Sequence, residues 1–155
     1  MAKNIYGDFK KKIDRIENHI AEEIAPQANR LFQESVRYAL VDWYNDYEPQ
    51  FYKRTNNFLG AYKSAKTIGK GKILSFSVDS DLMDSYDGWF GKSLQSSIAF
   101  DYMFMQGEHG HGKWMMHQSL PPYMYIERDI ESGFGGRLDK IINNKIEEIL
   151  RKWGK

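Results

Sequence analysis

Residues 43–62 read WYNDYEPQFYKRTNNFLGAY, and this stretch separates a helical first part of the chain from a mixed second part. An apolar helical stripe ends there in aromatic residues, meets Pro49 and runs into a basic Tyr-Lys-Arg-Thr segment. Proline cannot continue a helix, so we expect the helix to stop here. Aromatic residues this dense at a helix exit serve packing, either between elements of one chain or between subunits. No enzyme motif overlaps them.

Two apolar stripes with helical spacing precede this segment. The first stripe, after a helix start at Asp8, consists of Phe9, Ile13, Ile16, Ile20 and Ile24. The second, over residues 26–47, consists of Phe32, Val36, Leu40, Trp43 and Tyr47. Pro26 predicts that the first helix ends or kinks before it. Because proline is tolerated in a first helical turn, both stripes can also belong to one long kinked helix.

The remaining chain mixes strand, loop and helix signals. Residues 63–72, KSAKTIGKGK, predict a flexible basic loop, and residues 73–79, ILSFSVD, predict a strand. Residues 98–105, IAFDYMFM, fit a strand or a short buried helix. Pro121 and Pro122 open a helical pattern that SGFGG breaks, and a strong apolar stripe then predicts a last helix over residues 136–153.

These elements predict an α+β fold of long N-terminal amphipathic helices, a small central antiparallel β-sheet, and a C-terminal helix packed on the sheet. No linker or repeat divides the chain, so residues 1–155 are expected to form a single domain. Its parts are a helical N-terminal part (1–48), a part of sheet and loops (49–120), and a helical C-terminal part (121–155).

The composition is that of an ordinary globular protein except for its aromatic residues, which make up 15% of 155 residues. A formal net charge of +1 gives no overall field toward nucleic acid or an anionic membrane. The absence of cysteine excludes disulfides, thiolate catalysis and cysteine-based zinc sites. No apolar run approaches the roughly 20 residues of a membrane span, and the N-terminus lacks a secretory signal. A soluble protein, made and assembled in the cytoplasm, is expected.

The best candidates for enzyme chemistry are Glu108, His109, His111 and His117. Carboxylates and imidazoles bind transition metals, and residues two apart on a strand share a face. The glycines around them predict a mobile loop, whereas a metal site needs rigidly held ligands. His109, His111 and His117 are therefore weak metal candidates beside the alternative of a solvated loop. No nucleophile elbow or phosphate-binding motif is present, so we expect neither an enzyme nor a cofactor.

Four lysines gather in the predicted basic loop, namely Lys63, Lys66, Lys70 and Lys72. One loop of this kind is usually a solvated connection. Repeated around a ring, it would line a channel with charge and permit weak, sequence-independent contact with DNA. Besides the metal-dependent enzyme, a small nucleic-acid-binding module thus stays open as an alternative.

The order of segments resembles the phage neck, or tail-completion, family. Members of that family often carry an Arg-Thr-Gly-x-Leu core, and Arg54, Thr55, Asn56, Asn57, Phe58 and Leu59 stand in its place. Asparagine at the glycine position departs from the pattern, but it tolerates the left-handed conformation of a turn. A later family stretch is similar to Tyr102, Gly107, His109, Gly110, Pro121 and Pro122. Residues 80–97 are longer than the family pattern.

The resemblance implies a structural virion protein, a minor tail protein that forms an oligomeric ring around the DNA channel between head connector and tail. Its expected partners are copies of itself and other virion proteins, namely the head connector, the tail terminator or the tail tube. Non-specific contact with channel DNA through the four lysines is possible, and no membrane is involved. The expected location is the virion, assembled in the host cytoplasm.

For such a ring, the expected subunit interface consists of Trp43, Tyr44, Tyr47, Phe51, Tyr52 and Arg54. Expected loop contacts to a neighbouring ring are Trp89, Phe90, Trp114, Met115 and Met116, because methionine and aromatic side chains adapt to partners. Packing inside a single chain is the alternative for all of these apolar side chains.

Overall fold

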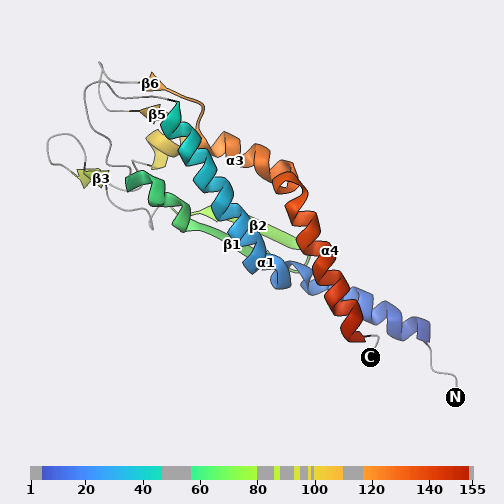
Figure 1. Cartoon of the computed structure of the whole chain (residues 1–155). Coiled ribbons are helices and arrows are strands. Elements are labelled where there is room, and N and C mark those ends of the chain that lie inside the picture. The colour runs from blue at the N-terminus through green and yellow to red at the C-terminus, as the bar shows by residue number, and fades with distance from the viewer. Residues whose placement is uncertain are drawn as a thin grey trace.

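The computed structural model describes residues 5–46, 57–79, 86–87, 93–94, 98, 100–109 and 117–153. The arrangement is elongated, with the start of α1 (Ile5–Asn45) and the end of α4 (Gly133–Trp153) at the same end (Figure 1). The short strands are β3 (Tyr86–Asp87), which pairs with β4 (Ser93–Leu94), and β5 (Glu108–His109), which pairs with β6 (His117–Gln118). The fold is α+β, as predicted.

α1 is a single helix of 41 residues with Pro26 inside it, so the prediction of one long helix is confirmed over that of two separate helices. Because Pro26 has no N–H, the carbonyl of Glu22 loses its partner in the helical ladder. The N–H of Ala21 donates to the carbonyl of Gly71 at 3.0 Å, outside the helix. Two interruptions this close together account for the bend between the two halves of α1 in Figure 1.

An antiparallel hairpin of β1 (Ala65–Lys70) and β2 (Ile73–Val78) lies along α1. The predicted strand at residues 73–79 is confirmed as β2, but the predicted loop at residues 63–72 is wrong, because most of it forms β1. The β1 backbone lies so close to α1 that a Cβ on Gly69 would be 2.0 Å from the carbonyl oxygen of Ala21. Residues 65–70 thus form a strand despite their loop-like composition, because strand preference depends mainly on packing against spatial neighbours, here α1.

The core lies where α1, the hairpin and the C-terminal helices meet. Its buried residues are Leu31, Phe32, Val36, Ala39, Leu40, Trp43, Tyr44, Phe58, Ala61, Ala65, Phe104, Ile126 and Phe134. The partly buried Phe76 of β2 connects the layers, with its ring 5.2 Å from that of Phe32 and 5.6 Å from that of Phe134. Two short helical segments add to this core: the 3-10 helix η1 (Asn57–Ser64) and the π-helix η4 (Phe100–Met105).

The C-terminal part consists of α3 (Pro122–Glu131) and α4, as the proline start and the glycine-rich break predict. The break is a left-handed turn in which Gly133, Phe134, Gly135 and Gly136 all have positive φ. A left-handed residue with a side chain costs about 1–2 kcal/mol. At Phe134 that cost is offset by the buried ring, which the turn directs into the core.

Candidate assembly surfaces

The aromatic residues at the end of α1 belong to the core of the single chain. Trp43 is 2% exposed and Tyr44 is 8% exposed. The ring of Trp43 lies 4.9 Å from that of Tyr44 and 5.9 Å from that of Phe58, both in edge contact. The structure therefore corrects the expected interface role of Trp43 and Tyr44, since other parts of the same chain already cover these rings. The other expected interface residues, Tyr47, Phe51, Tyr52 and Arg54, lie outside the described residues.

The expected loop contacts cannot be placed either. Trp89, Phe90, Trp114, Met115 and Met116 all lie outside the described residues. Some of the large apolar side chains that are exposed elsewhere in the described chain lie on two surfaces: Ile68 and Ile73 on one, and Phe9 and Leu150 near the other. One surface is on the hairpin, and the other lies between the ends of α1 and α4.

The first surface is the outer hairpin face, made of Lys66, Ile68 and Lys70 of β1 and Ile73, Ser75 and Ser77 of β2. Exposure alternates along both strands because successive side chains point to opposite faces. The inner residues turn toward α1, and the outer residues remain uncovered. Ile68 is 63% exposed, and Ile73, at 67%, is the most exposed large hydrophobic residue of the described chain. The face is mixed, with two exposed isoleucines among two lysines and two serines.

The four lysines predicted to face DNA lie on or beside this hairpin and differ in their partners. The Nζ of Lys66 lies 2.8 Å from the Asp79 carboxylate, and the Nζ of Lys72 binds the carboxylate of Glu17. Lys63 and Lys70 are exposed, and no described carboxylate forms an ion pair with them. Lys63 thus lies in η1, Lys66 and Lys70 in β1 and Lys72 in the hairpin turn, and two of the four charges are already partly neutralised.

The histidine candidates are brought together in part. The register of β5 and β6 places His109 opposite His117 and Glu108 opposite Gln118. His111 lies outside the described residues. Within the part of the chain that the structure describes, no three His, Asp or Glu side chains form a group that could hold a metal ion. In the described part of the chain, His109 and His117 face each other across the strand pair, but no complete set of metal ligands is formed.

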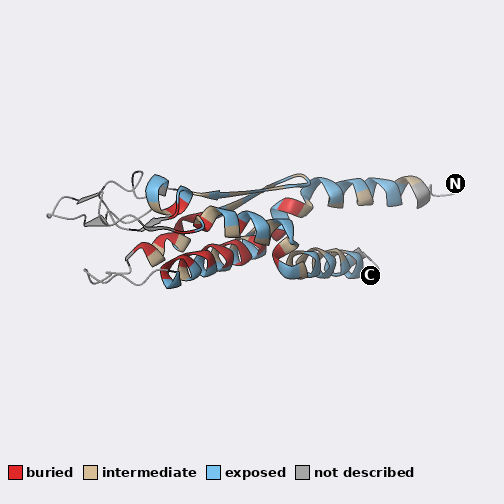
Figure 2. Cartoon of the chain, turned by 90° about the horizontal axis from the view of Figure 1, so that it is seen from above, coloured by how far each residue is buried: buried red, intermediate tan, exposed pale blue. Residues whose placement is uncertain are grey.

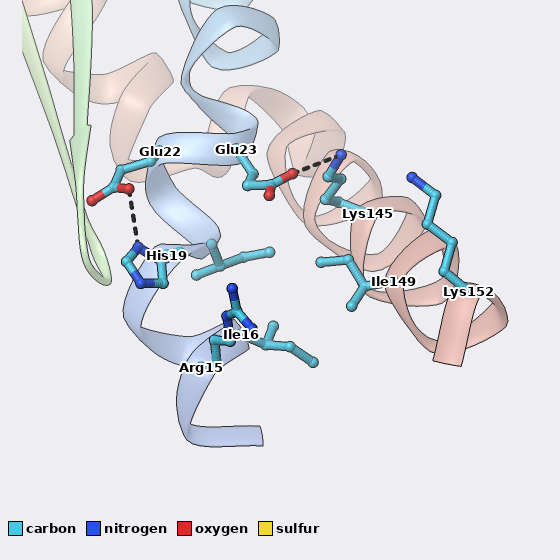
Figure 3. A pocket seen from close by; sticks show the side chains of 9 residues that line it. Arg15, Ile16, His19, Glu22, Glu23, Lys145, Ile149 and Lys152 are labelled. Atoms are coloured by element: carbon cyan, nitrogen blue, oxygen red, sulfur yellow. Dashed lines mark hydrogen bonds and ion pairs between the residues drawn. The ribbon is translucent and has the colours of Figure 1, made fainter. Parts of the chain in front are cut away.

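The second surface is the arm groove, a cavity of ≈ 560 Å³ between the first half of α1 and the end of α4 (Figure 3). Its lining consists of Arg15, Ile16, His19, Ile20, Glu22 and Glu23 of α1 and Lys145, Ile149 and Lys152 of α4. Lys145 and Glu23 link the two helices through an ion pair of 2.9 Å. The sequence shows both apolar stripes that meet here, but it contains no signal that the two helices lie side by side.

Ion pairs and hydrogen bonds link the charged side chains at the rim of the arm groove and shift the pKa values of three of them. The hydrogen bond with His19, followed by one from the N–H of Gly71, lowers the pKa of Glu22. Hydrogen bonds to Glu23 and then Glu148 raise the pKa of Lys145. Bonds from Lys152 and then Lys145 lower the pKa of Glu148. Glu22 and Glu148 are about half exposed, so solvent screens their ion pairs, which add little to stability. The Lys145 side chain is only 18% exposed and is held between Glu23 and Glu148.

Replacing His19 by alanine should raise the pKa of Glu22 toward its ordinary value of about 4.3, because the largest cause of its depression is removed. A carboxylate with a depressed folded-state pKa stabilises the fold above its unfolded pKa, and this contribution is lost as the pH falls through the folded pKa. The change can be measured by NMR titration of the glutamate side chains. Glu148, which is bound by Lys152, serves as an internal control that should not change. An unchanged Glu22 titration would contradict the assigned bond.

Comparison with known proteins gives the chain its family. The family described as YomN matches residues 6–152, and the chain belongs to this family. The family is phage-derived, of Bacillus phage type, so the chain is a phage-associated protein. No curated protein and no solved structure matches it. Among the described residues, no helix has both the length and the apolar character needed to cross a membrane.

Proposed function

We propose that this phage-associated protein is a structural part of the virion, a tail-completion or neck protein whose copies form a ring joining the head connector to the tail. In this proposal it is not an enzyme and acts by contact alone. Its partners are copies of itself, the head connector, and the tail terminator or tail tube. The observation that carries the proposal is the outer hairpin face, where apolar side chains lie uncovered on a strand pair.

The hairpin has the features of a contact between subunits. Among the described residues, no third strand pairs with β1 or β2, and α1 lies against the β1 backbone, so the outer edge of β2 is the one offered to another chain. Ile68 and Ile73 add apolar area on the outer face of the pair. A ring closes through head-to-tail contacts between two different surfaces of each copy. In this proposal the outer hairpin face supplies one such surface, with Ile68 and Ile73 at its centre and lysine and serine side chains around them.

The proposal includes contact with DNA in the channel. Lys63 and Lys70 provide charges without a described carboxylate partner. The exposed ion pairs of Lys66 and Lys72 are weak enough to exchange for phosphates. Such contacts would be independent of sequence and would weaken as salt increases.

The location is tested by purifying virions of the phage that encodes the chain and identifying their proteins by mass spectrometry. We expect the chain to be present in every purified particle. Phage lacking the gene should accumulate filled heads and separate tails, which electron microscopy distinguishes from complete particles. Complete, infectious particles made without the chain would overturn the proposal.

Replacing Ile68 and Ile73 together by aspartate should abolish joining while leaving the fold intact, because both side chains are exposed and contribute little to the core. Complementation of the gene deletion and the yield of infectious particles measure the effect. Tyr38→Asp is the matched control, since Tyr38 is also highly exposed but lies on α1. We expect full complementation by this control. Equal complementation by both variants would exclude the outer hairpin face from assembly.

A further inference from the structure

The ends of α1 and α4 form a second surface, the arm groove, in which Ile16, Ile20 and Ile149 lie among charged side chains and which the proposed ring does not use. We infer that the arm groove is a self-association surface, covered by the same two helices of a second copy to give a four-helix bundle. The N-terminal arm is defined as residues 7–20 of α1, and the C-terminal arm as residues 142–152 of α4. This contact uses other residues than the outer hairpin face, although the hairpin turn at Gly71 and Lys72 contacts Glu22 and Glu17 of α1, and it does not depend on the ring.

The N-terminal arm is amphipathic but has no core to cover it. Phe9, Ile13, Ile16 and Ile20 recur at spacings of four, three and four, yet no residue of the arm is buried. Phe9 is 56% exposed. Tertiary packing of an apolar side supplies most of the stability of helices in proteins. The arm continues into the packed part of α1, so it lacks only a cover for its own apolar side.

The C-terminal arm repeats the pattern. Ile142, Ile146 and Ile149 follow the same spacing, Leu150 is exposed, and no residue of this arm is buried (Figure 2). Ile16 and Ile20 of the N-terminal arm and Ile149 line the groove between the two arms. The ion pair of Lys145 with Glu23 ties the arms together. Each chain thus presents two adjacent helices whose apolar stripes are only partly covered.

The residue types favour a second copy as the occupant. Isoleucine at both core positions of a heptad pattern is typical of bundles with more than two helices. One chain supplies two helices, and a copy related by two-fold symmetry supplies an identical pair with the same spacing. The charges are compatible, because the groove is lined by Arg15, Lys145 and Lys152 together with Glu22 and Glu23. A surface of mixed sign can face itself, whereas a surface of one sign repels its copy.

The lengths of the two arms set the size of the contact. The 14-residue N-terminal arm is about 21 Å long, and two adjacent helices are about 20 Å wide. These lengths give a contact of about 400 Å² per partner, below the ~800 Å² of a standard interface, so the dimer is expected to be weak and reversible.

The mass of the full chain in solution tests this inference. The experiment uses the Ile68→Asp variant, so that association through the outer hairpin face does not contribute. Sedimentation should give about twice the 18.2 kDa of one chain. Adding Phe9→Asp should weaken the dimer at least about 100-fold, because it places a charge in the apolar seam. Phe9 lies outside the core, so this variant should still fold.

Cross-linking provides an independent readout, because the chain has no cysteine of its own. A short bismaleimide should link two copies of the Arg15→Cys variant, since Arg15 lines the groove. It should not link copies of the Asn45→Cys variant, in which the cysteine is exposed at the far end of α1. A single-chain mass at all concentrations, an unchanged dimer with Phe9→Asp, or equal cross-linking of both cysteine variants would overturn the inference. None of these outcomes affects the proposed ring, which is tested by complementation.

Discussion

Replacing Gly69 by alanine should lower the free energy of unfolding by about 3 kcal/mol or more, at the upper end of what overpacking costs. The new Cβ would lie 2.0 Å from the carbonyl oxygen of Ala21, 2.3 Å from its carbonyl carbon and 2.7 Å from the backbone nitrogen of Glu22. All three are backbone atoms, so no side chain can rotate away to make room. Either β1 or α1 must move, and the hydrogen bond from Ala21 to Gly71 would be strained as well. Urea unfolding followed by circular dichroism measures the loss.

Gly60→Ala is the control for this substitution. Gly60 lies in η1, and an added Cβ there meets no atom within 4 Å. Alanine at Gly60 should leave stability unchanged or raise it by about 0.4–1 kcal/mol, because it restricts the unfolded chain. If Gly69→Ala were as stable as Gly60→Ala, the close approach of β1 to α1 would be incorrect.

Replacing Trp43 by alanine should lower the free energy of unfolding by about 3–5 kcal/mol, the usual loss for a large aromatic residue in a core. The indole is buried in the core and contacts the rings of Tyr44 and Phe58, so its removal leaves a cavity. The variant also separates the two roles that the aromatic segment suggests. A core residue destabilises the isolated chain when it is replaced, whereas an interface residue weakens assembly and leaves the isolated chain stable.

Tyr38→Ala is the matched control for Trp43, on the same helix but 63% exposed. This change should alter the free energy of unfolding by no more than about 0.5 kcal/mol. Thermal unfolding of both variants under identical conditions gives the comparison. If the Trp43→Ala protein were as stable as the Tyr38→Ala protein, Trp43 would not be a buried core residue.

The helices could be predicted from the sequence because their signals are local. The stripe from Phe9 to Ile24, the proline start at Pro122 and the break at residues 132–136 each depend on neighbouring residues. The sequence could not decide whether Pro26 lies within one helix or between two. That outcome depends on the hairpin turn, where the carbonyl of Gly71 accepts a hydrogen bond from the N–H of Ala21. The strand β2 was predictable from its alternating residues, as was the α+β class.

Features that depend on distant parts of the chain could not be predicted. β1 looks like a loop because of its lysines and glycines, and only β2 and α1 make it a strand. Burial of Trp43 depends on Phe58, which is separated from it by a predicted turn. The arm groove needs two helices from opposite ends of the chain to lie side by side. Spacing along the sequence reports which residues share a face, but not what covers that face.

The core around α1 is also assembled late during translation. Most of its residues come from α1, but it is completed by Phe104, Ile126 and finally Phe134. A ribosome adds about 5–20 residues per second, so roughly 5–20 s separate the synthesis of α1 from that of Phe134. Throughout this interval the apolar side of α1 has only part of its final cover, which comes from Phe58, Ala61 and Ala65. We therefore expect host chaperones to shield the nascent chain until its last helix emerges.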